Sequence, residues 1–215
     1  SDNGGMEGAG SATFTDNFPL HRGKISVHEG GTRVPMIVTG PGIPANVQTE
    51  VMANGMDFYP TILSLIQAQK PADKIFDGCD LAPLLTSDPR DATLVRDSKG
   101  QVRDTMMWHF PQMESTSSIR VGNYKLVRRY GRGTPTVSLY QLYRTEGGKQ
   151  VRGDIEEAHD LAAAMPEKMA ELDALLTSKI AAAGGRIPYG NPSSSATLPG
   201  KEQAPEVLRH VQKEN

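Results

Sequence analysis

The sequence predicts an α/β part followed by a small α+β domain of about four antiparallel strands and one helix. Up to about residue 100, one β-rich run is followed by a segment with helical spacing. Beyond that point the apolar residues alternate with a period near two, and a long amphipathic helix follows. We therefore place an α/β part at 1–100, the small domain at 101–190 and an irregular tail at 191–215.

The elements of the first part are set by turn residues and apolar spacing. Residues 1–23 are rich in Gly, Ser, Thr and Asn and predict a loop. Residues 33–39 form a continuous apolar run closed by Gly-Pro-Gly, which predicts a buried strand. Apolar spacing over 56–68 predicts a helix, with Asp57 as its cap. The polar stretch 87–100 is the predicted boundary.

The second part is predicted as a meander packed by a helix. Gly122-Asn123 suits a tight connection between strands. Residues 166–183 predict the helix, because one apolar stripe runs between a proline and a pair of glycines. The predicted strands are 105–109, 117–121, 124–130 and 137–143.

Composition excludes several classes of protein. The 215 residues hold 23 Lys+Arg and 25 Asp+Glu, a net charge of −2, which argues against a nucleic-acid partner. Every apolar run is far shorter than the ~20 residues of a membrane span, so no membrane partner is expected. A single cysteine, Cys79, excludes a disulfide framework and a multi-cysteine zinc site.

Two short segments hold candidate chemistry. Asp2 and Asn3, followed by two glycines, offer adjacent oxygens that suit a hard cation such as calcium, although an ordinary Asn-Gly turn explains them equally. Lys24 follows a glycine and suits an anion, although most lysines are simply solvated. Glu29 and Arg33 are four residues apart and suit a structural ion pair.

Taken together and in order, these segments resemble the type I, formylglycine-dependent sulfatases of the alkaline phosphatase superfamily. The resemblance covers about residues 1–190 and implies an alkaline-phosphatase-like sulfatase fold, of which this sequence is expected to be the C-terminal part. The matching motifs are Ser1-Asp-Asn-Gly-Gly5, Pro19-Leu-x-x-Gly-Lys24, Glu29-Gly-Gly-x-Arg-Val-Pro35, Asp57-x-x-Pro60-Thr61, Asp77-Gly-x-Asp-Leu81, Pro83-Leu-Leu85, Trp108-His-Phe-Pro111, Ile119-Arg-x-Gly-x-Tyr-Lys-Leu126, Leu139-Tyr-Gln-Leu142 and Glu157-x-x-Asp-Leu161.

The resemblance assigns roles to individual residues. It implies that Asp2 and Asn3 are calcium ligands and that Lys24 contacts the sulfate group. His109 is a candidate for the substrate mouth, with a structural role at a strand end as the alternative. His21 stands where many relatives have arginine, so its role stays open.

The family's nucleophile is a formylglycine made from cysteine in a Cys-x-Pro/Ala-x-Arg segment. Cys79 is followed by Asp-Leu-Ala-Pro and lacks the arginine, so we expect it to be a buried structural residue. The nucleophile and the other metal ligands are expected in a missing N-terminal half, which is therefore a partner of this part. This chain alone is predicted to be inactive.

The function implied is that of a sulfuric ester hydrolase, arylsulfatase-like, acting on a sulfated small molecule or carbohydrate with calcium as cofactor. A periplasmic or secreted location follows from the resemblance, although no targeting segment is visible. Two alternatives remain. One is a phosphatase or phosphodiesterase of the same superfamily, which would use two zinc ions and Asp-His in place of Asp2-Asn3. The other is a non-catalytic fragment or module that binds sulfated glycans or pairs with another chain.

Overall fold

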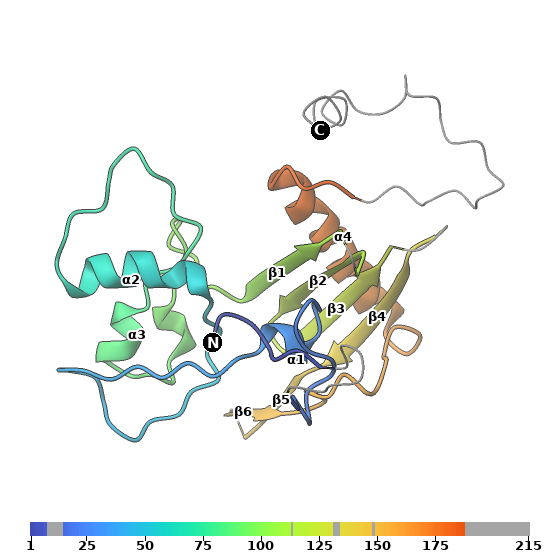
Figure 1. The fold of residues 1–215 in the computed structure, drawn as a ribbon, viewed down its shortest axis with the longest axis horizontal. Coiled ribbons are helices and arrows are strands. Elements are labelled where there is room, and N and C mark those ends of the chain that lie inside the picture. The colour runs from blue at the N-terminus through green and yellow to red at the C-terminus, as the bar shows by residue number, and fades with distance from the viewer. Residues whose placement is uncertain (8–14, 113, 131–133, 148, 188–215) are drawn as a thin grey trace.

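The fold is built around one antiparallel sheet with a long helix on one face (Figure 1). The structure is a computed structural model that describes residues 1–7, 15–112, 114–130, 134–147 and 149–187. Neighbouring strands pair in the order β1-β2-β3-β4, which confirms the predicted meander. The strands are β1 (Thr105–Phe110), β2 (Thr116–Val121), β3 (Tyr124–Arg129) and β4 (Thr136–Gln141).

Helix α4 (Pro166–Ala182) covers one face of this sheet and confirms the predicted amphipathic helix. Its stripe of Leu172, Leu176 and Ile180 is fully buried. That stripe packs against a row of residues aligned across three strands, so one continuous apolar layer joins helix and sheet. The row consists of Ile119, Leu126 and Leu139, which are paired in the strand register.

The opposite face of the sheet carries the N-terminal segment with the one-turn helix α1 (Glu29–Thr32). Here Val27 packs with Val127 and Tyr140. The face also carries Lys125, which is fully buried. Sequence positions about 100 residues apart are therefore brought together on this face.

A second small core lies beside the sheet and holds α2 and α3 (Figure 1). Cys79, Leu81, Leu84 and Val95 form this core, so the predicted buried role of Cys79 is confirmed. The elements around it are the 3-10 turn η1 (Gly55–Asp57), α2 (Phe58–Leu65), α3 (Ala82–Thr86) and the 3-10 turn η2 (Ala92–Leu94).

Three predicted details differ from the structure. Residues 33–39 do not form a strand, because no described segment pairs with them and an extended chain becomes a strand only through a neighbour's hydrogen bonds. Asp57 is the N-cap residue of α2, as predicted, but its side chain makes no capping bond there. Its carboxylate instead accepts from the backbone N–H of Asn54 at 2.7 Å and closes a capping box around η1. The predicted fourth strand is split, and Tyr143 begins a separate hairpin of β5 (Tyr143–Glu146) and β6 (Lys149–Arg152).

All named strands lie beyond residue 104, but α1 packs on their sheet, so the predicted boundary near residue 100 stays a prediction. The tail predicted at 191–215 lies outside the described residues. Among the helices that the structure describes, none has the length and apolar character required to cross a membrane.

Candidate functional site

The Asp2-Asn3 segment is anchored to α1 through its glycines. The N–H of Gly4 donates to the Gly31 carbonyl at 3.0 Å. A Cβ at Gly4 would lie 1.6 Å from the carbonyl oxygen of Gly30, so only glycine permits this approach. The glycine is buried while Asp2 remains exposed and Asn3 half-buried. The two candidate ligands are therefore presented at the surface from a fixed backbone.

The Asp2-Asn3 segment also forms the backbone contact that positions Lys24. The N–H of Lys24 donates to the Gly5 carbonyl at 2.8 Å, and the side chain of Asn17 bonds both the N–H and the carbonyl of Gly5 at 3.1 and 3.0 Å. The backbone of Lys24 is thus tied to the chain two residues beyond Asn3. The structure brings together the three residues that the sequence nominates, and Lys24 is exposed there.

The turn that presents Lys24 has unusual backbone angles. Arg22 has φ of 60° and Ile25 has φ of 73°, both in the left-handed region. This region is rare for side chains and is a genuine outlier for a β-branched residue such as Ile25. The fold holds this conformation around Gly23-Lys24, and strained backbone of this kind concentrates at functional sites.

His109 lies on the sheet face that α4 covers, away from this segment. Its Nδ1 lies 2.7 Å from Ser117 Oγ, and its Nε2 lies 2.9 Å from the carbonyl oxygen of Arg186. Both ring nitrogens have partners within the chain. The arrangement favours the structural role that the sequence offered as an alternative, and a substrate contact by His109 stays a prediction.

Cys79 is not built as a nucleophile. It is 2% exposed, and its N–H donates to Asp57 Oδ1 at 2.8 Å. Burial raises the pKa of the thiol, so the reactive thiolate is disfavoured.

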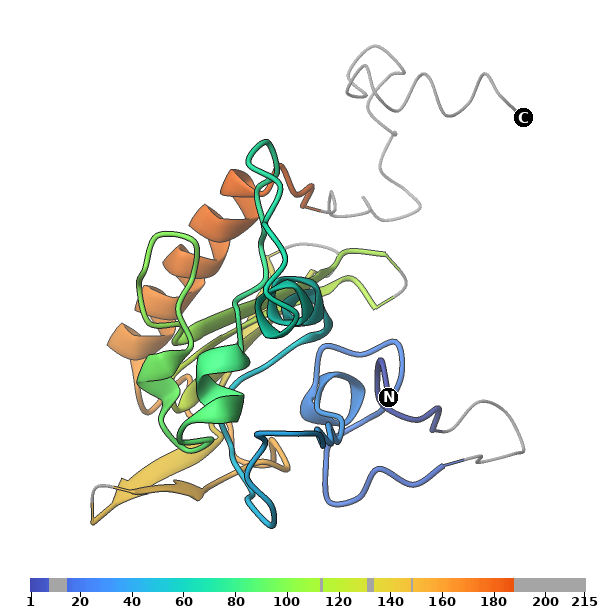
Figure 2. The ribbon, with the colours of Figure 1, turned by 90° about the vertical axis from the view of Figure 1, so that its left-hand side faces the viewer.

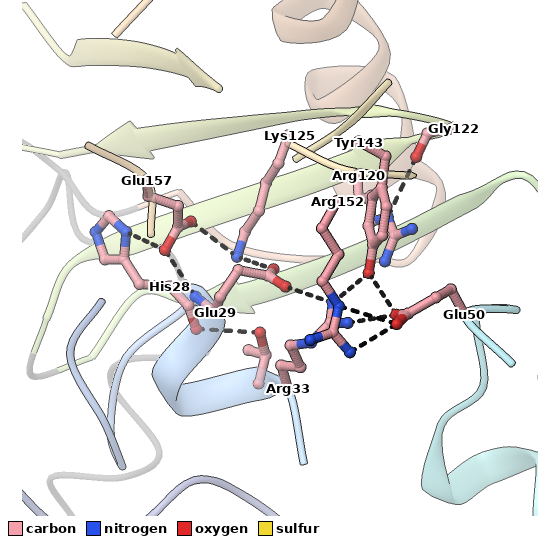
Figure 3. Close-up of polar contacts among 11 residues, drawn as sticks. His28, Glu29, Arg33, Glu50, Arg120, Gly122, Lys125, Tyr143, Arg152 and Glu157 are labelled. Carbon is pink, nitrogen blue, oxygen red and sulfur yellow. Dashed lines mark hydrogen bonds and ion pairs between the residues drawn. The ribbon is translucent and has the colours of Figure 1, made fainter. Parts of the chain in front are cut away.

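A buried ion cluster fixes α1 to the sheet, and the sequence patterns did not reveal it (Figure 3). The Nζ of Lys125 lies 2.8 Å from Glu29 Oε1 and 3.0 Å from Glu157 Oε1. The second oxygen of Glu157 accepts from the N–H of Glu29 at 2.7 Å and lies 3.2 Å from His28 Nδ1. We call these four residues, His28, Glu29, Lys125 and Glu157, the buried ion cluster.

The neighbours of Glu157 in this cluster stabilise its charged carboxylate. Burial alone would raise the pKa of Glu157, but the Lys125 ammonium, together with His28 and the Glu29 N–H, lowers it. Glu157 is therefore held as a carboxylate inside the protein. A buried ion without its partner would destabilise the fold. The ion pairs are kept only when α1 lies in this one position on the sheet, so the cluster fixes that position.

A more exposed set of contacts extends the cluster toward the β5–β6 hairpin (Figure 3). Arg33 reaches Glu29 at 3.4 Å, which confirms the predicted ion pair. It also contacts Glu50 at 2.5 Å and the Tyr143 hydroxyl. Glu50 further binds Arg152 at 2.7 Å, so one carboxylate joins α1 to the hairpin.

The side chains of Asp2 and Asn3 offer oxygen atoms to a calcium ion. Asn3 Nδ2 donates to Asp2 Oδ2 at 2.6 Å, which leaves Asp2 Oδ1 and Asn3 Oδ1 as hard oxygen donors. Within the described ranges, no group of three or more His, Cys, Asp or Glu side chains is placed to hold a metal. Asp2 and Asn3 fit as two oxygen ligands, and a calcium ion takes more than two.

Comparison with known proteins finds similarity to sulfatases. The sulfatase family model matches residues 1–68. A sulfatase of Formosa agariphila is 38% identical over 115 residues, which are 52% of this chain and 18% of that protein. Arylsulfatase G of Canis lupus familiaris is 29% identical over 156 residues, 68% of this chain and 25% of that protein. The chain is therefore similar to sulfatases over these ranges.

The fold of this chain agrees with that of two solved structures. The structure of BT4656 in complex with D-glucosamine-2-N,6-O-disulfate covers 71% of this chain with a TM-score of 0.53 and 21% identity. The yidJ protein of Bacteroides fragilis covers 74% with a TM-score of 0.55 and 18% identity. The chain spans about a fifth to a quarter of the length of the two curated relatives named above, and 29–31% of these two solved chains.

Proposed function

We propose that this chain forms part of a sulfuric ester hydrolase, in which Asp2 and Asn3 bind a calcium ion and Lys24 binds the sulfate group. The observation that carries this proposal is the bond from the Lys24 N–H to the Gly5 carbonyl, which holds Lys24 beside the Asp2-Asn3 segment. A cation site and an ammonium on one surface suit a tetrahedral dianionic group or the ester that carries it.

Lys24 supplies a positive charge that does not depend on the metal. When a sulfate ester is cleaved, negative charge gathers on the departing oxygen and on the sulfate oxygens, and a fixed ammonium stabilises that charge. The backbone bond to Gly5 and the strained turn at Arg22 and Ile25 keep the backbone of Lys24 in place. A calcium ion held by Asp2 and Asn3 would supply Lewis-acid polarisation of the same oxygens.

The substrate class that we propose is a sulfated carbohydrate or a sulfated small molecule. The relatives support this, since one solved structure holds a disulfated glucosamine and another curated relative is named N-acetylgalactosamine-6-sulfatase. The nucleophile is proposed to be a formylglycine outside these 215 residues, and a periplasmic or secreted location also remains a proposal.

The 215-residue chain by itself is predicted to be inactive, because its single cysteine is buried and lacks the Cys-x-Pro/Ala-x-Arg context. The measurement is turnover of an aryl sulfate by the purified chain. Release of the phenol at a rate above that of a heat-inactivated sample would show that this chain holds a complete catalytic apparatus and would contradict the assignment.

Metal analysis separates this proposal from the phosphatase alternative. The complete product of the gene that encodes this chain is expected to contain calcium, and Asn3→His is expected to weaken calcium binding because imidazole is a poor ligand for that ion. Stoichiometric zinc in the unaltered protein would overturn the proposal in favour of a two-zinc phosphatase or phosphodiesterase.

A further inference from the structure

A cavity of about 160 Å³ lies between the loop before Lys24 and the sheet strands β3 and β4. It is smaller than the roughly 300–1,000 Å³ of sites for drug-sized ligands, so it suits a single functional group. The residues that line it include His21, Arg22, His28, Arg129, Ser138 and Tyr140.

The lining is rich in positive charge and hydroxyl groups. The acids nearest to it are already engaged: Glu114 pairs with Arg22 at 3.0 Å, and Glu157 belongs to the buried ion cluster. Among the described residues, no carboxylate lies within ion-pair distance of Arg129. The chemistry of the cavity therefore selects an anion over a cation or an apolar group.

Two histidines line the cavity, of which His21 is exposed and His28 is buried. His28 is 5% exposed, and its ring centroid lies 4.6 Å from that of His21. Its Nδ1 faces Glu157, as Figure 3 shows, and its Nε2 makes no hydrogen bond within the described part of the chain. Burial and the neighbouring His28 lower the pKa of His21. An anion in the cavity would offset both effects and favour the protonated imidazole.

The cavity is close to the proposed sulfate contact. His21 and Lys24 are three residues apart, so their Cα atoms are separated by at most about 11 Å. The His21 carbonyl accepts from the Gly30 N–H at 2.9 Å, which fixes the cavity wall on the same α1 segment that anchors Asp2-Asn3. A substrate with two anionic groups on one or two sugar rings can span that distance.

We propose that this cavity is a second anion subsite, which binds a further sulfate or carboxylate of the same substrate. The proposal rests on the proposed function for its choice of substrate. Arg129, His21 and His28 would bind the second group while Lys24 binds the sulfate ester. The preferred substrates would then be carbohydrates that carry at least two anionic groups.

The first test is a titration of the 215-residue chain with sodium sulfate, followed by NMR of the histidine rings against sodium chloride of equal ionic strength. Saturable shifts of the His21 and His28 rings are expected, and Arg129→Gln should weaken them about fivefold or more. Arg129 is exposed, so this variant should fold, which its thermal unfolding midpoint checks. Shifts that sodium chloride reproduces, or that Arg129→Gln leaves unchanged, would overturn the subsite.

The pH dependence provides a second readout. Binding should be severalfold tighter at pH 6 than at pH 8, because the anion favours protonated His21. The charged and titratable groups around His21 are Glu7, Arg22, His28, Arg129, Tyr140 and Glu157. Equal affinity at both pH values would contradict the participation of His21.

The last test distinguishes the subsite from the proposed function. A glucosamine with two sulfate groups should bind at least tenfold more tightly than one with a single 6-sulfate, and Arg129→Gln should remove that difference. Equal binding of the two sugars would overturn the subsite. Lys24→Gln should leave the inorganic sulfate shifts of His21 and His28 in place. If those shifts persist while neither sugar responds to Lys24→Gln, the proposed function fails and the anion site stands.

Discussion

Lys125 is a lysine with no exposed surface, held between two carboxylates from other parts of the chain. Glu29 lies 96 residues before it in the sequence, and Glu157 follows β6. A buried charge of this kind is stable only with its partners. Its position explains why the α1 segment, and with it the Lys24 turn, has a fixed place on the sheet.

Replacement of Lys125 with methionine should destabilise the protein by about 3–5 kcal/mol, because two buried carboxylates lose their counter-charge. Urea unfolding measures this change. The exposed Lys99→Met is the control and should change the unfolding free energy by no more than about 0.5 kcal/mol. A Lys125→Met protein as stable as the control would show that the cluster does not hold α1 in place.

The left-handed conformation of Ile25 leads to a second prediction at this scale. Ile25→Gly relieves a backbone cost of about 1–2 kcal/mol, although glycine adds about 0.5–1 kcal/mol of unfolded-chain entropy. Ile25→Ala is the matched control, because it shortens the same half-buried side chain but keeps a Cβ in the left-handed region. Ile25→Gly should therefore be more stable than Ile25→Ala by about 1 kcal/mol in thermal unfolding. The reverse order would mean that the turn is not strained.

At the scale of elements, sequence patterns correctly predicted the helix and strands whose apolar residues have a regular spacing. The four strands and α4 follow from alternation and helical spacing, because each buries one apolar face. The continuous apolar run at 33–39 also predicts a strand, but a strand needs a neighbour, and no sequence pattern reports whether one is present. The β5–β6 hairpin is polar and gave no alternation to detect.

The candidate site likewise contains some residues that sequence motifs predict and others that only the fold brings together. Asp2, Asn3 and Lys24 were found through motifs within the first 24 residues, and the bond from the Lys24 N–H to the Gly5 carbonyl brings their backbones together. The buried ion cluster and the cavity at Arg129 depend on contacts over about 100 residues. Such contacts depend on the tertiary fold, so spacing along the chain contained no sign of them.

Asp57 connects the segments around α2 and α3, and its contribution to their stability can be tested. Its carboxylate is fully buried and binds Arg103 at 2.7 Å and the Cys79 N–H at 2.8 Å. Asp57→Asn leaves the Arg103 guanidinium without its counter-charge and should cost about 3–5 kcal/mol. Hydrogen exchange should rise in α2 and α3 before it rises in α4.

The exposed Asp77→Asn is the matched control, and it should leave the exchange of all three helices unchanged. If Asp57→Asn exchanged like this control, Asp57 would not contribute to the stability of α2 and α3. If α4 lost protection together with α2 and α3, the two cores would unfold as a single unit.

At the scale of the whole molecule, the apolar cluster around Val27 and the buried ion cluster place a short N-terminal segment on the sheet. The segment presents Asp2, Asn3 and Lys24 at the surface, and the sheet supports it from below. Sites built on rigid elements hold charges with the precision that transition-state stabilisation needs. This support is the contribution of the small sheet to the proposed chemistry.

The central claim is that Lys24 stabilises a sulfate ester during its hydrolysis. The most direct test is kcat/KM for an aryl sulfate and for the matching aryl phosphate, measured on the complete product of the gene that encodes this chain. The sulfate is expected to be the preferred substrate, and Lys24→Gln should lower its kcat/KM by about 100-fold or more, while the exposed Lys99→Gln leaves it unchanged. A preference for the phosphate, or a Lys24→Gln variant with the activity of the unaltered enzyme, would contradict the claim.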